Sequence, residues 1–180
     1  MNPLEIIAKY YPMESEAYRI LVNHSKSVAE KALAIARMHP EMSLDLAFIE
    51  EAAMLHDIGI FRCDASEIDC HGNEPYIRHG YLGAELMRTE GYPRHARVCE
   101  RHTGCGITAA MVEAQQLPLP KRDFTPETME EQLICFADKF YSKTKLDKEK
   151  PIEKVRKSLA KYGEETVERF DNWCKLFLGE

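Results

Sequence analysis

Apolar residues recur every three or four positions along most of this chain, and the strict apolar–polar alternation of β-strands is absent. Within residues 15–37, for example, Leu21, Val28 and Ile35 fall on one helical face, and His24 lies in the same stripe. This period is that of an amphipathic α-helix, because side chains three and four positions apart share a face. The pattern therefore predicts an all-α fold.

Capping residues, prolines and glycines set the expected helix boundaries. Ser15 caps a first helix that runs to about Arg37, and Ser43 caps a second that ends at His56, with Gly59 as its stop signal. Residues 60–75 are expected to form an irregular loop. The remaining expected helices cover about 76–90, 94–102, 109–115, a segment that starts at the Thr125-Pro126-Glu127 cap and includes Asp138, and 151–178 with one potential break at Gly163.

The length of 180 residues corresponds to about one domain. Hydrophobic residues make up 44% of the chain and charged residues 30%, which is ordinary for a globular protein. Because internal repeats and Ser/Gly linkers are absent, we expect one domain over 1–180. Its core spans about 18–145, and a C-terminal helix at about 151–178 packs against that core.

The formal net charge of −6 disfavours binding to a nucleic acid polymer, which normally requires a basic face. A small anionic substrate remains compatible with this charge if a bound cation supplies positive charge locally. The six cysteines form no C-x-x-C pair, and no segment approaches the ~20 apolar residues of a membrane helix. The N-terminus lacks the apolar stretch of a signal peptide. We therefore expect a reduced, cytoplasmic protein without membrane partners, and leave its oligomeric state open.

Histidines and aspartates on the apolar faces are the candidates for chemistry. A single histidine there is usually an ordinary core residue, but a carboxylate at Asp138, between Phe136 and Phe140, is costly to bury unless it is paired or metal-bound. Imidazole and carboxylate ligands together suit iron, manganese, cobalt or zinc. The candidates are His24, His56, Asp57, His79, His102 and Asp138.

Residues 56–59 read HDIG, and the chain resembles the HD-domain metal-dependent phosphohydrolases from about His24 to Lys143. In order, the resemblance rests on HSKSVAEKALAIA, LHDIG, RHGYLGAEL, ERHTG and ADK. It implies an HD-domain helical bundle and hydrolysis of a phosphorylated substrate, the similarity being closest to the dinuclear bacterial hydrolases of dinucleoside polyphosphates. Gly91-Tyr92-Pro93 matches part of the signature of cyclic-di-GMP phosphodiesterases, but it precedes His102 and we interpret it as a helix-ending turn.

The resemblance assigns His24, His56, Asp57 and Asp138 to the basic metal site of the family. His79 and His102 match the additional ligands of dinuclear members, in which the aspartate of the HD pair bridges two ions. We therefore expect two divalent transition-metal ions, with Asp57, His79 and Lys139 as catalytic residues. The expected contacts to substrate phosphate are Arg62, Arg78, Lys121, Arg122 and Lys139, and the segments 60–75 and 103–123 are expected at the pocket rim.

Three other interpretations use the same residues. A nucleotidase with one metal ion would need only His24, His56, Asp57 and Asp138. An HD-fold oxygenase would use a di-iron site with an identical ligand set. A non-catalytic module that binds nucleotides would keep the helices, but would have no need of the two additional histidines.

Overall fold

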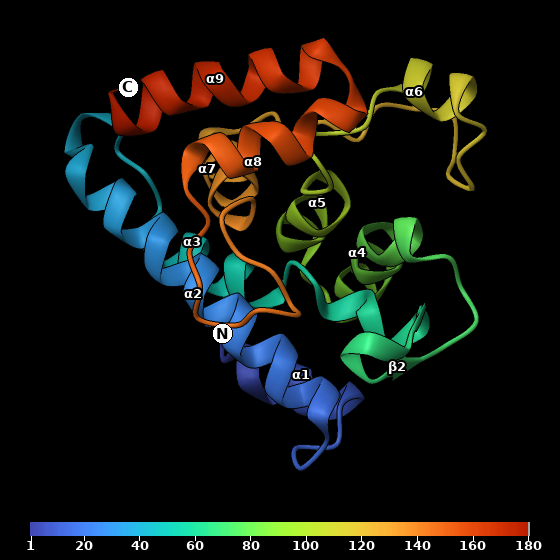
Figure 1. Cartoon of the computed structure of the whole chain (residues 1–180). Helices are drawn as coiled ribbons and strands as arrows, with labels where there is room; N and C mark the ends of the chain where they lie inside the picture. Colours follow the sequence, from blue (N-terminus) through green and yellow to red (C-terminus); the bar gives the residue numbers. More distant parts are fainter. Residues whose placement is uncertain (180) are drawn as a thin grey trace.

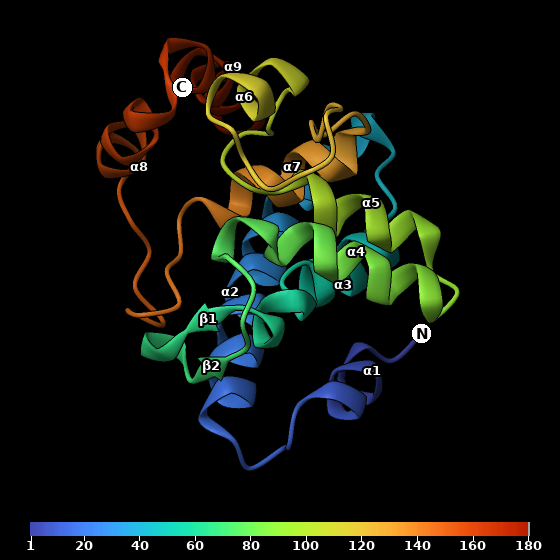
Figure 2. The same ribbon diagram turned by 90° about the vertical axis from the view of Figure 1, so that its right-hand side faces the viewer.

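The computed structural model describes residues 1–179, and the fold in this range is helical apart from one two-stranded sheet, as predicted. Figures 1 and 2 show the arrangement from two sides. The α-helices are α1 (Pro3–Tyr10), α2 (Glu16–Met38), α3 (Leu46–Leu55), α4 (His79–Thr89), α5 (Pro93–Arg101), α6 (Ala109–Ala114), α7 (Met129–Asp138), α8 (Ile152–Leu159) and α9 (Glu164–Leu178). Short 3-10 helices are η1 (Pro40–Met42), η2 (Ile58–Arg62), η3 (Ser66–Ile68), η4 (Tyr76–Arg78) and η5 (Ala160–Tyr162).

Residues 60–75 are more regular than the sequence predicts. They contain most of η2, all of η3, and two antiparallel strands, β1 (Asp64–Ala65) and β2 (Cys70–His71). Gly59 does not act as a helix stop, because it lies inside the 3-10 helix η2, which follows α3. The N-terminal helix α1, which the sequence analysis did not predict, is capped by the side chain of Asn2.

Two predicted helix caps are wrong, and one is confirmed. Ser15 accepts a hydrogen bond from Tyr18 N and begins α2 as expected. Ser43 instead adopts a left-handed conformation, and Asp45 caps α3. Thr125 also lies outside its helix. Thr128 caps α7 in a capping box with Glu131, a pairing that satisfies two backbone N–H groups at once.

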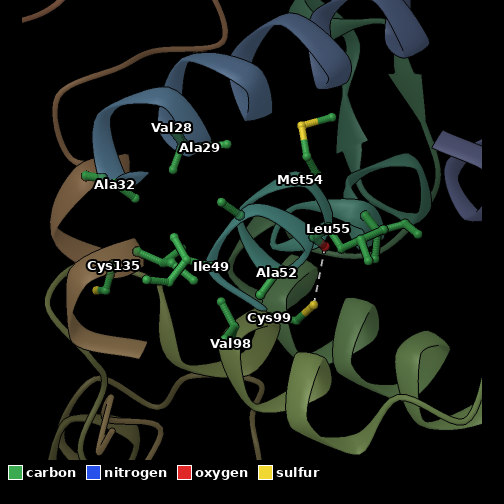
Figure 3. Close-up of a cluster of buried hydrophobic side chains, with 14 of the residues drawn as sticks. Val28, Ala29, Ala32, Ile49, Ala52, Met54, Leu55, Val98, Cys99 and Cys135 are labelled. Carbon is green, nitrogen blue, oxygen red and sulfur yellow. Dashed lines mark hydrogen bonds between the residues drawn. The ribbon is translucent and has the colours of Figure 1, made fainter. Parts of the chain in front are cut away.

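The main hydrophobic core lies between α2, α3, α5 and α7 (Figure 3). Small side chains allow close approach: α2 contributes Ala29 and Ala32, and α3 contributes Ala52 beside the larger Ile49. The Cys99 thiol on α5 donates to the carbonyl oxygen of Leu55 at 3.3 Å, which joins α5 to the end of α3. This packing fixes the ends of the helices that carry the candidate ligands.

The turn that follows α3 is held by close backbone packing and by one buried hydroxyl. A Cβ placed on Gly59 would lie 2.3 Å from the carbonyl oxygen of His79 and 2.5 Å from the nitrogen of Gly83, so only glycine allows η2 to approach α4 this closely. The buried Tyr11 hydroxyl donates to Ile58 O at 2.7 Å and accepts from Phe61 N at 3.1 Å. Both contacts position the HDIG segment.

The apolar side chains of the C-terminal helices pack against the core. Phe136 of α7 contacts the rings of Phe170 and Phe177 on α9. The helical stretch of residues 152–178 is interrupted before α9 at Gly163, which has a φ of 110°. Figure 1 shows α9 (red) above α7. Among residues 1–179, no helix is both long and apolar enough to cross a membrane.

Candidate metal centre

Six predicted ligand residues, all buried, converge from five helices and their ends. His24 projects from α2, and Asp138 is the last residue of α7. His56 and Asp57 follow α3 directly, while His79 begins α4. The sixth, His102, is the C-terminal cap of α5.

The first group of ligand atoms joins His24, His56, Asp57 and Asp138. His24 Nε2 lies 2.9 Å from Asp138 Oδ1 and 3.2 Å from Asp57 Oδ2. His56 Nε2 lies 3.3 Å and 3.0 Å from the same two oxygens. Two nitrogens thus face two carboxylate oxygens at one point.

The second group joins His79 and His102 to the other oxygen of Asp57. Asp57 Oδ1 lies 3.3 Å from His79 Nε2 and 3.1 Å from His102 Nε2, and these nitrogens are 3.0 Å from each other. Asp57 therefore offers Oδ2 to one group and Oδ1 to the other.

Backbone carbonyls orient three of the four imidazoles. The Nδ1–H groups of His56, His79 and His102 donate to the carbonyl oxygens of Ala53, Tyr76 and Cys99, at 2.6, 2.6 and 2.7 Å. In the neutral ring this leaves the lone pair on Nε2, which points toward Asp57. A hydrogen bond of this kind is the usual support of a metal-binding histidine.

The donor atoms fit shared cations. Without a proton or a metal ion between them, the Nε2 lone pairs of His79 and His102 would face each other and an ionised carboxylate, which is repulsive. Ligands about 2.1 Å from one tetrahedral ion are about 3.4 Å apart. The contacts of 2.9 to 3.3 Å that His24 and His56 make with Asp57 and Asp138 are close to this separation.

The ionisation of these groups follows from burial and charge. Burial opposes the charged form of His56, but Asp57 and Asp138 outweigh it and raise its pKa to about 10. Burial lowers the pKa of His102 to about 4, although Asp57 opposes the shift. Despite burial, His56 and Lys143 hold the pKa of Asp57 well below its usual range. The site therefore has ionised carboxylates and attracts positive charge.

Two lysines contact the carboxylates, and one of them was not predicted. Lys139 Nζ lies 2.8 Å from Asp138 Oδ2 and donates to His102 O at 2.9 Å. Lys143 Nζ, missed by the sequence analysis, lies 2.7 Å from Asp57 Oδ2. Burial opposes the charge of both ammonium groups, but the neighbouring carboxylates raise the pKa of each above its usual value.

An open cavity of about 420 Å³ adjoins the ligands. Asp138, Lys139 and Lys143 line its inner part, and Tyr76, whose ring stacks on His79, contributes to the same wall. The outer lining comes from the α7–α8 connection and from α8 with η5: Tyr141, Ser142, Thr144, Lys150, Ser158, Leu159, Lys161 and Tyr162. Glu67, Ile68 and Gly104 complete it. The predicted rim segments 60–75 and 103–123 thus contribute little to the wall, and the 141–162 region, which was not expected there, contributes most of it.

Of the predicted phosphate contacts, Lys139 is among the residues that line this cavity, whereas the other four are not. Those four side chains pair with carboxylates away from the ligand groups. Arg78 binds Glu74 at 2.7 Å, and Arg62 lies 3.9 Å from Glu85. Lys121 pairs with Glu113 at 2.7 Å, and Arg122 with Glu100 at 3.0 Å. The lining of the cavity includes Lys143 and none of these four, so the structure favours Lys143 over them as a candidate contact to phosphate.

Comparison with known proteins gives a family match and several relatives. The pattern of the HD domain matches residues 21–142. An uncharacterised protein of Methanocaldococcus jannaschii is 36% identical over 145 residues, which are 78% of this chain and 78% of that protein. The HD domain of the Listeria monocytogenes phosphodiesterase PgpH matches with a TM-score of 0.53 at 14% identity, covering 94% of this chain and 93% of that one. At this identity the likeness shows the fold alone, and the fold is that of an all-α HD domain.

Two further relatives carry the name tRNA (cytidine(56)-2′-O)-methyltransferase. The one from Thermoplasma volcanium is 30% identical over 179 residues, and the one from Picrophilus torridus is 34% identical over 146 residues. The matches cover 98% and 76% of this chain, but 47% and 38% of those proteins. This chain therefore spans about half or less of their length.

Proposed function

Because this chain belongs to the HD-domain family, we propose that it is a metal-dependent phosphohydrolase with a dinuclear site. One observation carries the proposal: Asp57 presents one carboxylate oxygen to each of two histidine groups. The residues proposed to hold two divalent ions are His24, His56, Asp57, His79, His102 and Asp138. Iron, manganese, cobalt and zinc all suit such ligands.

The bound metal would supply Lewis-acid activation of water and neutralisation of phosphate charge. The chain's own residues hold this arrangement. The Nδ1–H bonds to Ala53, Tyr76 and Cys99 keep three imidazole rings in place. Lys139 and Lys143 bring two ammonium groups to the inner cavity, where they would stabilise negative charge that develops on a phosphoryl group.

The chemistry of the cavity supports an anionic substrate. Four of its lining residues are lysines, namely Lys139, Lys143, Lys150 and Lys161, whereas its carboxylates are Asp138 and Glu67. Hydroxyl groups from serine, threonine and tyrosine add hydrogen-bond donors for phosphate oxygens. A phosphoester or phosphoanhydride of a nucleotide or a related small molecule fits this lining.

The names of two relatives favour a second candidate substrate. Both relatives are named for action on tRNA, and this chain matches less than half of each. We therefore do not extend methyl transfer to this chain. A phosphate group carried by RNA is instead a candidate substrate for the same metal centre.

A phosphate-release assay tests the proposal. Protein loaded with Mn²⁺, Co²⁺, Fe²⁺ or Zn²⁺ would be tested on nucleoside monophosphates, nucleoside diphosphates, dinucleoside polyphosphates and phosphorylated RNA ends. We expect release with at least one class, loss of release in Asp57→Ala, and full retention in Cys70→Ala. Undiminished release by metal-free Asp57→Ala protein would refute hydrolysis at this site.

The same metal-loaded proteins distinguish the dinuclear hydrolase from the three alternative functions. A single-metal nucleotidase would hold one ion per chain and would tolerate His79→Ala. A di-iron oxygenase would consume oxygen and give a mixed-valence iron signal. A binding module would take up a nucleotide without releasing phosphate from any substrate.

A further inference from the structure

The segment from Lys143 to Lys161 is strongly basic within an acidic chain. Its 19 residues include eight of the chain's 24 lysines and arginines, and only three of its 30 aspartates and glutamates. The net charge of −6 therefore conceals a local excess of positive charge. This segment forms the outer wall of the cavity described above.

Four of these lysines form one stripe. Lys154, Lys157 and Lys161 are separated by three and four residues, so they share one face of α8 and its continuation into η5. Lys150 precedes this face, in the irregular connection just before Pro151, and forms the first position of the stripe. The opposite face carries the buried Val155 and Leu159. Because the apolar face fixes the rotation of the helix, the lysine face must point outward.

The stripe is continuous with the cavity and available to a ligand. Its two ends, Lys150 and Lys161, line the cavity, and Lys154 and Lys157 lie exposed between them. Within residues 1–179, no carboxylate lies within ion-pair distance of any of these four ammonium groups. Two of the three acids in this segment are engaged elsewhere: Glu149 pairs with Lys31 and Glu153 with Arg156.

Aromatic side chains accompany the lysines. Tyr76, Tyr141 and Tyr162 line the same cavity, and Lys161 lies over the ring of Tyr162. A basic groove with interleaved aromatic rings is the typical surface for single-stranded nucleic acid, in which lysines follow the backbone and rings stack on bases. At about 1.5 Å per residue, the eight-residue α8 extends about 12 Å. A strand that rises about 3.4 Å per nucleotide would place three or four phosphates along it.

We propose that the lysine stripe of α8 binds the backbone of a single-stranded polynucleotide whose terminal phosphate enters the cavity beside Lys143. The proposal rests on the phosphohydrolase function and names its substrate class. Lys139 and Lys143 would contact the terminal phosphate beside the candidate metal ligands, and the preceding phosphates would lie on Lys150, Lys154, Lys157 and Lys161. The expected absence of a nucleic acid partner, which was based on net charge, would then be wrong for this surface.

Fluorescence anisotropy on the metal-loaded protein tests the proposal. The probes are a short fluorescent oligoribonucleotide with a terminal phosphate and an oligodeoxyribonucleotide of the same sequence. We expect the double variant Lys154→Gln/Lys157→Gln to bind roughly tenfold more weakly, and the slope of log K against log salt to become shallower by about 1.4. The matched control is Lys26→Gln/Arg37→Gln, which removes two exposed cations from α2 and should bind like the wild type.

Two further measurements keep the proposal separate from the hydrolase function. Hydrolysis of a mononucleotide by Lys154→Gln/Lys157→Gln should equal that of the wild type, because neither lysine lines the cavity. Asp57→Ala should still bind the oligonucleotides with most of the wild-type salt dependence, even if hydrolysis is never detected. Equal affinity and equal salt slope in wild type and the α8 variant would overturn the proposal. Binding to anionic phospholipid vesicles with no binding to either oligonucleotide would also overturn it.

Discussion

The Nε2 atoms of His79 and His102 lie 3.0 Å apart, and each ring donates its Nδ1–H to a backbone carbonyl. Both Nε2 lone pairs therefore converge on the same point beside Asp57 Oδ1. A cation placed there turns a repulsive contact into an attractive one. On the other side of Asp57, His24 and His56 face Oδ2, and His56 likewise donates its Nδ1–H to a backbone carbonyl.

Removal of one histidine from the second ligand group should abolish binding of one of the two ions. We expect His102→Ala to bind one ion per chain where the wild type binds two, because the first ligand group remains complete. Inductively coupled plasma mass spectrometry after dialysis measures this ratio. Cys70→Ala, a buried substitution outside both groups, should keep two ions. Unchanged stoichiometry in His102→Ala would contradict the assignment of the second group.

Lys143 should contribute to catalysis without holding metal. Its ammonium group lies at Asp57 and lines the cavity, so Lys143→Gln should lower kcat by about 10²-fold and leave the metal content unchanged. Arg62→Gln provides the comparison, since Arg62 is exposed and weakly paired with Glu85. If Arg62→Gln reduced kcat as much as Lys143→Gln, the assignment of the cavity would be wrong.

Tyr11 should stabilise the HDIG turn. Tyr11→Phe leaves Ile58 O and Phe61 N without their buried partner, which should lower the free energy of unfolding by about 1–3 kcal/mol. Urea denaturation measures the change. Tyr18→Phe is the control, because the Tyr18 hydroxyl has no hydrogen-bond partner among the described residues. Equal losses in the two variants would show that the hydroxyl contacts add nothing.

The loss of stability on replacing a glycine by alanine should be larger where the new Cβ would lie closer to a backbone atom. Gly59→Ala places a Cβ 2.3 Å from His79 O, so it should cost at least about 3 kcal/mol or prevent folding. At Gly83 the nearest atom would be 3.2 Å away, and Gly83→Ala should cost less. Thermal melts and circular dichroism compare them. A Gly59→Ala protein as stable as the wild type would contradict the close approach of η2 and α4.

The contact between α1 and α4 should weaken in acid. Lys9 and Tyr10 donate hydrogen bonds to Glu90, and they lower the pKa of its carboxyl below the usual value. The stabilisation is therefore present above the unfolded pKa of about 4.3 and is lost as pH falls through the lower folded value. Because the pair is near the surface, Glu90→Gln should cost about 1 kcal/mol or less at pH 7.

The measurement for this prediction is the difference in unfolding free energy between wild type and Glu90→Gln from pH 7 to pH 3. We expect the difference to shrink as pH falls. A difference that stays constant over this range, or grows in acid, would contradict the depressed pKa of Glu90.

The sequence predicts the all-α fold, and it also points to the six residues that the fold brings together, because both leave local signals. The helical period continues through α2, Ser15 caps it, and HDIG marks the turn after α3. Thr128 was missed although its capping-box partner Glu131 follows three residues later, since the competing Thr125-Pro126 signal is also a strong helix start. The predicted cap Ser43 is also two residues too early, because Asp45 caps α3.

Tertiary contacts explain the remaining misses. Lys143 has no local pattern that separates it from the other lysines around it, and only the fold brings it to Asp57. Arg122 pairs with Glu100, a partner 22 positions away that no spacing rule identifies. Arg78 pairs with Glu74, four residues earlier, but Glu74 lies before η4 in non-helical chain, so the pairing interval of helices does not identify this contact either.

The central claim is that Asp57 joins two ions, and anomalous scattering from crystals of the metal-loaded protein tests it most directly. We predict two peaks per chain, one on each side of the Asp57 carboxylate: the first among His24, His56 and Asp138, the second beside His79 and His102. A structure of protein saturated with metal that shows no anomalous peak beside Asp57, or shows its ions bound elsewhere, would contradict the claim.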